Sequence, residues 1–125
     1  MNAPKNLLYT KTHEWILKEE NVYTVGITDH AQKELGDLVF INLPNVGDEV
    51  VSGEALADVE SVKAVSDIIS PISGTVAEVN EELLDAPEKI NQNPYEAWIA
   101  KIDNVTDVEK LMSADEYEAF LGEEG

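Results

Sequence analysis

The chain has 125 residues, of which 26 are acidic and 8 are basic, and its formal net charge is -18. All of the basic residues are lysines and no cysteine is present, which excludes disulfides, thiolate metal sites and a cysteine nucleophile. Binding to nucleic acid or to an anionic membrane is not expected either, because phosphate recognition requires clustered Lys and Arg.

Alternating polar and apolar residues predict a chain made mainly of short strands. Tyr23, Val25 and Ile27, for example, share one face of an expected strand. Residues 71–74 (PISG) predict a turn, and the Pro- and Asn-rich residues 86–95 predict a loop. The expected strands cover residues 22–28, 37–44, a segment from about 55, then 64–70, 75–83 and 96–102.

One short helix is expected between the first two of these strands. Thr28 or Asp29 is a suitable N-cap, because its side-chain oxygen can accept a free backbone N–H of the first turn. Gly36 follows at the position where glycine commonly ends a helix in a left-handed conformation.

The last part of the chain changes to a helical period. Thr106 with Glu109, and Ser113 with Glu116, form two capping boxes, and Gly122 is expected to end the second helix. One or two short helices should therefore pack on the strands instead of forming a second domain. We expect one domain over residues 1–125, with a β core at about 7–102 and a helical tail at about 106–122.

Lys63 is the only basic residue between positions 33 and 89, and its segment allows two structures. Val62, Val65 and Ile69 fall at helical spacing, so an amphipathic helix is one of them. Their β-branched side chains lower helix propensity and favour strands. We therefore favour a strand, a turn and a second strand.

A weak internal repeat supports this hairpin. Residues 52–60 (SGEALADVE) resemble residues 73–80 (SGTVAEVN) when one gap is allowed. Lys63 lies ten residues after Gly53 and eleven residues before Gly74. Two similar halves indicate a β unit of approximate two-fold symmetry, in which Lys63 lies at the tip of the connecting hairpin.

Several roles can be weighed for a lysine at such a tip. Most lysines are solvated surface residues, but Val62 and Ala64 lack the Asn-Gly or Asp-Gly chemistry of an ordinary tight turn. A Schiff-base lysine needs a desolvated amine in a pocket, whereas Glu60 and Asp67 nearby favour a charged ammonium. The lysine is thus presented to solvent, as the target of a covalent modification would be.

Four segments carry a family resemblance that extends from about Leu7 to the C-terminal helix. They are residues 12–15 (THEW), 25–47, 60–74 and 93–102, and the combination of ESVKA with GITDHAQ before it is the specific part. The chain resembles the family of glycine cleavage H proteins. By this resemblance the fold is mainly β, a lipoyl/biotinyl-like flattened β-barrel (hammerhead) with short helices, including a C-terminal helical tail.

The resemblance implies that Lys63 carries lipoate in amide linkage and that the protein is a carrier and not an enzyme. The lipoyl arm would take an aminomethyl group from the pyridoxal-phosphate-dependent glycine decarboxylase (P protein). It would deliver that group to the tetrahydrofolate-dependent aminomethyltransferase (T protein), and dihydrolipoamide dehydrogenase (L protein) would reoxidise it. Lipoate-attaching enzymes would be further partners.

The resemblance also implies roles for residues around the lysine. Glu60 and Gly74 match positions that lipoate-attaching enzymes are thought to read in this family. Thr12, Glu14 and Asp67 match positions that line a cleft for the loaded arm. Carboxylates there would hold a cationic amine through charge-assisted hydrogen bonds. From the sequence alone, solvated acids and an ordinary turn glycine are equally acceptable interpretations.

Other side chains are interpreted as structural. Asp29 and His30 are sequence neighbours, which seldom orient one another, so they are not expected to form a catalytic dyad. His13 and both tryptophans are expected to pack in the structure, the tryptophans as core anchors. Ala97 stands where the family often has Gly, so the resemblance does not predict the geometry of the loop around Tyr95.

Three alternatives stay open. A biotin carrier would share the fold, although biotin acceptors usually set the lysine between methionines, and here Val62 and Ala64 flank it. A relay protein would pass lipoyl groups to other carrier domains, and an acidic module would bind partners without modification. We expect a monomer. We also expect a cytoplasmic location, because no apolar run has membrane-spanning length and no signal peptide is evident. A removed mitochondrial transit peptide would leave no trace.

Overall fold

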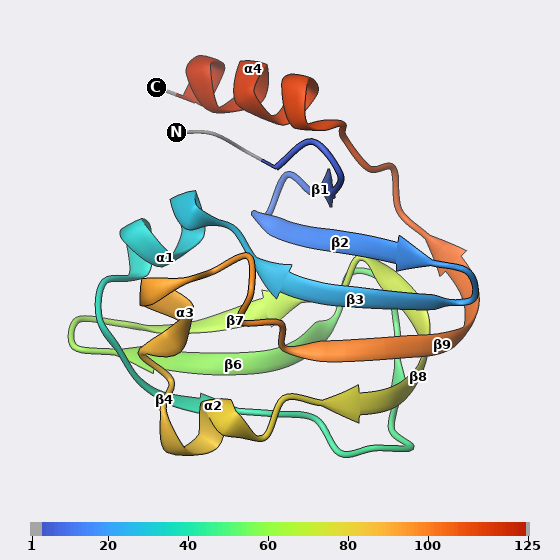
Figure 1. Cartoon of the computed structure of the whole chain (residues 1–125), viewed down its shortest axis with the longest axis horizontal. Helices are drawn as coiled ribbons and strands as arrows, with labels where there is room; N and C mark the ends of the chain where they lie inside the picture. The colour runs from blue at the N-terminus through green and yellow to red at the C-terminus, as the bar shows by residue number, and fades with distance from the viewer. Residues whose placement is uncertain (1–3, 125) are drawn as a thin grey trace.

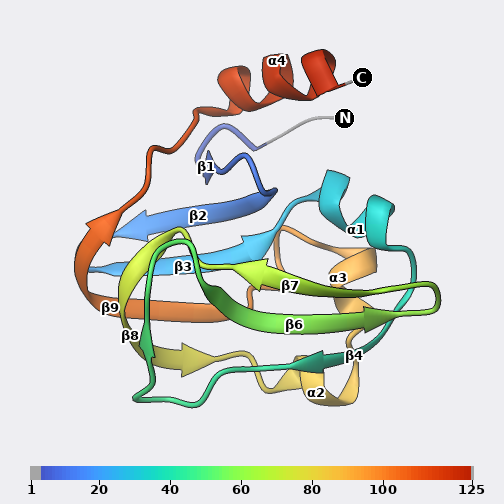
Figure 2. The same ribbon diagram turned by 180° about the vertical axis from the view of Figure 1, so that it is seen from behind.

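The computed structural model describes residues 4–124, which form two antiparallel β-sheets with helices beside them (Figures 1 and 2). The predicted mainly-β fold is confirmed. Among the described residues, no helix has both the length and the apolar character that a membrane crossing requires. The strands are β1 (Leu8–Tyr9), β2 (Glu14–Glu19), β3 (Val22–Ile27), β4 (Leu38–Asn42), β5 (Glu49–Val50), β6 (Ala55–Ser61), β7 (Val65–Ile69), β8 (Ile72–Val79) and β9 (Ala100–Val108).

The two sheets share one core. The larger sheet has the strand order β1-β2-β3-β9-β8-β5, and the smaller sheet has the order β4-β6-β7. Buried aliphatic side chains from both sheets belong to one cluster, among them Ile16 and Val25 from the larger sheet and Val59 and Ile68 from the smaller. Removal of this apolar surface from water, at about 25 cal/mol per Å², is the main force that holds the sheets together.

Gly26 permits a close approach within the larger sheet. Trp15 in β2 lies opposite Gly26 in β3, and a Cβ on that glycine would lie 2.5 Å from the Trp15 ring. The Trp15 indole N–H donates to the carbonyl of Pro94 at 2.9 Å. Trp15 is therefore a core anchor, as the sequence predicted. Trp98 is only partly buried, with the Lys101 ammonium 5.1 Å from its ring centre, but it packs against the buried cluster that contains Trp15, so the same expectation holds for Trp98 only in part.

Helix α1 (Asp29–Leu35) lies between β3 and β4, as its capping residues predicted. Thr28 is the N-cap, and its hydroxyl accepts the backbone N–H of Ala31 at 3.2 Å. Gly36, with a φ of 82°, ends the helix, and its own N–H donates to the carbonyl of Gln32.

Helix α4 (Ala114–Glu124) begins with the second of the predicted capping boxes. The Ser113 N–H donates to the Glu116 carboxylate at 2.8 Å, and the Glu116 N–H donates to the Ser113 hydroxyl at 3.2 Å. Gly122 lies within α4, so the expectation that it ends the helix is wrong; an exposed glycine near a helix end costs only about 1 kcal/mol. The helix lies over β1 and β2 at the edge of the larger sheet (Figure 1).

The first predicted capping box, Thr106 with Glu109, is wrong because β9 continues through Thr106 to Val108. Val108 pairs with Ile72 of β8, whose side chain is fully buried. For the same reason residues 71–74 are not a turn, since β8 begins at Ile72. Pairing between two long strands outweighs these local turn and capping signals.

Two short helices occupy a region expected to be the end of a strand and then a loop. They are α2 (Glu82–Asp85) and α3 (Lys89–Gln92), the second of which lies within the expected loop at residues 86–95. Leu83 and Ile90 are the buried members of these helices and are completely shielded from solvent. Burial of these two side chains outweighs the loop preference of the Pro and Asn residues around them.

Candidate functional site

Lys63 lies at the tip of the hairpin formed by β6 and β7. The strands pair in antiparallel fashion as far as Glu60 and Val65, so the predicted hairpin is confirmed and the helical alternative is wrong. Lys63 and both of its neighbours are exposed, and the tip projects at the end of the molecule where α1 lies (Figure 2). Within residues 4–124, no carboxylate lies within ion-pair distance of the Lys63 ammonium.

Ser61 closes this turn, although the sequence prediction gave it no role. Its hydroxyl oxygen accepts the backbone N–H of Lys63 at 3.2 Å and that of Ala64 at 3.0 Å. Its own N–H donates to the Ala64 carbonyl at 2.8 Å. A serine hydroxyl therefore replaces the Asn-Gly chemistry of an ordinary tight turn and orders the tip without burying the lysine.

The tip rests on the residues that follow α1. The Val62 N–H donates to the carbonyl of Asp37 at 3.0 Å. The aliphatic stem of Lys63 lies over Gly36, where a Cβ would be 3.4 Å from the lysine Cε. Because Gly36 has a positive φ, a side chain at this position would be strained as well as crowded. The glycine that ends the helix thus also leaves room for the lysine.

The three residues matched to an arm cleft do line one cleft. Thr12 and Glu14 reach it from the turn between β1 and β2 and from the start of β2, and Asp67 reaches it from β7. The third wall is α1, which contributes Ala31 and Leu35. The volume of about 150 Å³ is small for a ligand pocket, so the cleft suits the end of an extended group. One side of α1 therefore borders the cleft, and the residue that ends the helix, Gly36, borders the lysine stem.

Glu14 is the buried carboxylate of this cleft, with only 3% of its surface exposed. Its Oε1 accepts hydrogen bonds from the hydroxyls of Thr10, at 2.7 Å, and Thr12. Burial raises the pKa of Glu14; the two hydroxyls lower it in part, and the Glu109 carboxylate raises it further. A cation placed in the cleft would favour the charged carboxylate.

Two more cleft residues were not assigned to it from the sequence. His13, expected to be structural, borders the cleft between Thr12 and Glu14, and Glu34 borders it from α1. His13 also has a structural contact, since its Nδ1 lies 2.8 Å from the hydroxyl of Tyr117. The sequence around His13 and Glu34 does not indicate that they border a cleft, because the turn and the helix that carry them meet only in the folded chain.

Glu60 and Gly74 lie in different sheets. Glu60 is exposed near the end of β6, opposite Val65 beside the hairpin tip. Gly74 lies within β8, opposite Val50, and is not the turn residue that the sequence allowed. A Cβ on Gly74 would be 2.6 Å from the carbonyl oxygen of Asp103, so packing alone explains the glycine. Recognition of either residue during lipoate attachment stays a prediction.

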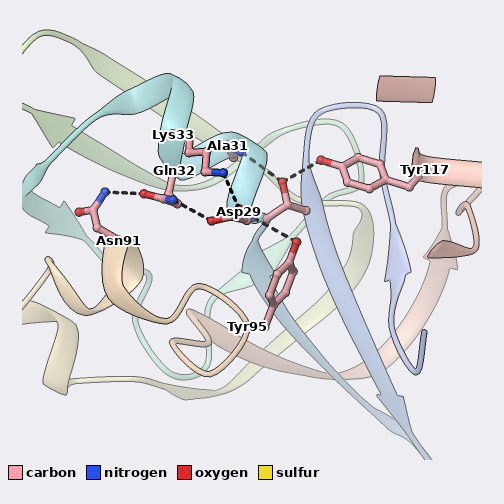
Figure 3. A network of polar contacts seen from close by, with 8 residues as sticks. Asp29, Ala31, Gln32, Lys33, Asn91, Tyr95 and Tyr117 are labelled. Carbon is pink, nitrogen blue, oxygen red and sulfur yellow. Dashed lines mark hydrogen bonds and ion pairs between the residues drawn. The ribbon is translucent and has the colours of Figure 1, made fainter. Parts of the chain in front are cut away.

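Asn91 of α3 holds the link between α1 and β4 (Figure 3). Its Nδ2 donates to the Gln32 Oε1 at 3.0 Å and to the Gly36 carbonyl at 2.9 Å. Its Oδ1 accepts the backbone N–H of Leu38 at 2.9 Å. One amide side chain thus fixes the backbone on which the lysine stem rests.

The loop around Tyr95, whose geometry the sequence did not predict, contacts the N-terminal end of α1 (Figure 3). The Tyr95 hydroxyl accepts the backbone N–H of Asp29 at 3.2 Å. The Asp29 carboxylate lies 3.2 Å from the Lys33 ammonium and accepts the Gln32 amide at 2.8 Å. Its side chain is therefore engaged within α1, in agreement with the expectation that Asp29 and His30 do not form a catalytic dyad.

Comparisons with known proteins identify the family. The family model described as glycine cleavage H-protein matches residues 7–124. A glycine cleavage system H protein of Lachnoclostridium phytofermentans is 59% identical over 125 residues, which cover 99% of this chain and 98% of that protein. A probable glycine cleavage system H protein of Pyrococcus abyssi is 56% identical over 121 residues, which cover 94% of this chain and 90% of that protein. The crystal structure of a glycine cleavage system H protein from Mycobacterium marinum matches with a TM-score of 0.91 at 42% identity, covering 96% of this chain and 99% of that one. The chain therefore belongs to the glycine cleavage H-protein family, a carrier component of the glycine cleavage system.

Proposed function

We propose that Lys63 carries lipoate in amide linkage and that the chain shuttles an aminomethyl group within the glycine cleavage system. One observation carries this proposal. An exposed lysine at an ordered hairpin tip lies at the end of the same helix that borders a cleft with the buried carboxylate Glu14. Membership in the glycine cleavage H-protein family supports it.

The residues around the tip fit an acyl group on the lysine amine. No described carboxylate pairs with the Lys63 ammonium, so acylation would break no ion pair within residues 4–124. Gly36 leaves space beside the lysine stem, and Ser61 orders the backbone without covering the amine. When attached, lipoate supplies a flexible arm whose dithiolane serves thiol–disulfide exchange and aminomethyl transfer. The chain itself supplies position and access.

Thr12, Glu14 and Asp67 are proposed to hold the cationic end of the loaded arm. Glu14 is fixed in advance by two threonine hydroxyls, so its carboxylate need not reorganise to accept an ammonium group. Ala31 and Leu35 give the opposite wall apolar surface, which limits access of water. These residues would delay hydrolysis of the group until it is transferred.

The proposed partners are the glycine decarboxylase, the aminomethyltransferase and the dihydrolipoamide dehydrogenase of the system. Lipoate-attaching enzymes are proposed to recognise Glu60 and Gly74. A net charge of -18 favours encounter with basic surfaces on these enzymes. We propose that the chain acts as a carrier without catalysis of its own, as a monomer in the cytoplasm.

Intact mass spectrometry of protein from cells supplied with lipoate tests the attachment. The wild type is expected to gain one lipoyl increment, and Lys63→Ala is expected to lose it completely. Lys5→Ala removes another exposed lysine, with 83% of its side chain accessible, and is expected to keep the increment. A biotin increment, no increment in the wild type, or an increment that persists in Lys63→Ala would overturn the proposal.

A further inference from the structure

The hydroxyl of Tyr117, on α4, contacts the elements that form two of the three walls of the cleft, the turn before β2 and the start of α1. It lies 2.8 Å from Nδ1 of His13, in the wall formed by the turn between β1 and β2. It also lies 2.8 Å from the hydroxyl of Thr28, the N-cap of α1, which forms another wall. In either direction of donation, one hydroxyl group links the two walls.

The first wall contains a backbone conformation that needs support. His13 has a φ of 72°, in the left-handed region that residues other than glycine seldom adopt. Its carbonyl accepts the Thr28 N–H at 3.0 Å, and its N–H donates to the Thr10 carbonyl at 3.2 Å. Because His13 lies directly between Thr12 and Glu14, a change in its backbone angles would move both polar residues of the cleft.

The second wall depends on the same tyrosine through Thr28. The Thr28 side chain is fully buried, and its hydroxyl accepts one of the free N–H groups in the first turn of α1, that of Ala31. The Thr28 carbonyl accepts the Gln32 N–H at 3.1 Å. Ala31 itself borders the cleft, so the start of this helix sets the position of the apolar wall.

Tyr117 is also held by contacts outside the cleft. Its ring is fully buried and stacks on Tyr9, with centroids 4.7 Å apart and planes inclined by 10°. The helix that carries it is capped by Ser113 and Glu116. The docking of α4 on β1 therefore helps to set the position of the hydroxyl.

We propose that Tyr117 is a positioning residue, which holds the two walls of the cleft in register for the end of the arm. The inference rests on the proposed function, because it concerns the same cleft. It assigns the C-terminal helix a role beyond packing: α4 fixes the geometry in which Glu14 and its neighbours meet the arm.

Tyr117→Phe and Tyr9→Phe form a matched pair for the test. Each removes one hydroxyl from the same buried ring stack, but the Tyr9 hydroxyl donates to the Pro4 carbonyl at 2.6 Å and, within residues 4–124, forms no hydrogen bond with a residue of the cleft. Amide hydrogen exchange is measured on the unmodified chain. Tyr117→Phe is expected to speed exchange at His13, Thr28 and Ala31 about ten-fold relative to Tyr9→Phe, as expected for loss of a buried hydrogen bond. Equal exchange in the two variants would overturn the inference.

A second measurement separates this inference from the proposed function. Lipoylated protein is loaded with glycine and glycine decarboxylase, and hydrolytic loss of the load is followed after removal of the enzyme. Glu14→Ala is expected to lose the load fastest, then Tyr117→Phe, and Tyr9→Phe is expected to match the wild type. If Glu14→Ala also matches the wild type, the proposed role of the cleft is rejected, while the exchange measurement still decides whether Tyr117 holds its walls.

Discussion

The turn at residues 61–64 and the turn at residues 10–13 both join neighbouring antiparallel strands, and in both a hydroxyl accepts a backbone N–H. At the hairpin tip, the Ser61 hydroxyl and every other side chain of the turn are partly or fully exposed. In the turn at residues 10–13, Lys11 and Thr12 are exposed, but Thr10 is fully buried, and Glu14, which follows the turn in β2, is nearly so. Contacts from Tyr117 and Thr28 reach the cleft turn from far along the chain.

The difference suits the two turns to two roles: one keeps a side chain accessible to other proteins, and the other holds a carboxylate away from water. An exposed turn, held by the Ser61 hydroxyl and by the hydrogen bond from the Val62 N–H to the Asp37 carbonyl, keeps a lysine within reach of several enzymes, and the loss of one bond exposes polar groups that water can satisfy. A turn that joins buried residues can fix a carboxylate in a small cleft, but each of those buried polar groups depends on a protein partner. Substitutions that remove similar hydroxyls should therefore have very different effects in the two turns.

The largest effect is expected for Thr10→Val. The Thr10 hydroxyl donates to the Glu14 carboxylate at 2.7 Å and accepts the Glu14 backbone N–H at 3.0 Å. Its loss leaves a buried charge and a buried N–H without these partners, so we expect a decrease of about 3 kcal/mol in the free energy of unfolding. Denaturant titration at neutral pH measures it. Thr106→Val, at an exposed position in β9, is the control, and an equal cost in both variants would contradict the comparison.

A smaller effect, which depends on pH, is expected for Glu14→Gln. Burial raises the pKa of Glu14 above its usual value of 4.5, so the folded chain holds this proton more tightly than the unfolded chain. The stability from this group is complete below the unfolded pKa and is lost as the pH rises through the folded pKa. Glu14→Gln should therefore lose less stability than the wild type between about pH 4.5 and neutral pH.

Denaturant titrations across this pH range test the prediction, with Glu78→Gln as the control at an exposed carboxylate (63% accessible). If the wild type and Glu14→Gln show the same slope of stability against pH, Glu14 does not titrate as a buried group. The cleft turn would then resemble the hairpin tip more closely than its burial indicates.

The two turns also differ in how far the sequence could predict them. The hairpin followed from β-branched residues and a repeat on either side of Lys63, all of which are local signals. Its closing hydroxyl, Ser61, was missed, although a serine two residues before the lysine was a visible signal for such a turn. Thr12, Glu14 and Asp67 came from the family resemblance, because separate elements bring them together.

Distance along the chain explains the remaining differences. The helical period of the tail predicted that its helices pack on the strands, but His13 and Thr28 lie 104 and 89 residues from Tyr117, and no pattern in the sequence links them. The capping box predicted at Thr106 is wrong because pairing of β9 with β8 overrides the local signal. Local rules thus predicted individual elements, whereas the cleft depends on how α1, α4 and the first turn pack together.

The smallest effect is expected for Ser61→Ala. The hydroxyl accepts the backbone N–H groups of Lys63 and Ala64, but these amides lie at an exposed tip, where water can replace it. We expect a loss of about 0.5 kcal/mol in the free energy of unfolding, together with faster amide exchange confined to Lys63 and Ala64. Ser61→Thr, which keeps a hydroxyl, is the matched control and should preserve the slow exchange. A loss as large as that of Thr10→Val would mean that the tip depends on buried contacts, and the contrast between an accessible turn and a sheltering one would fail.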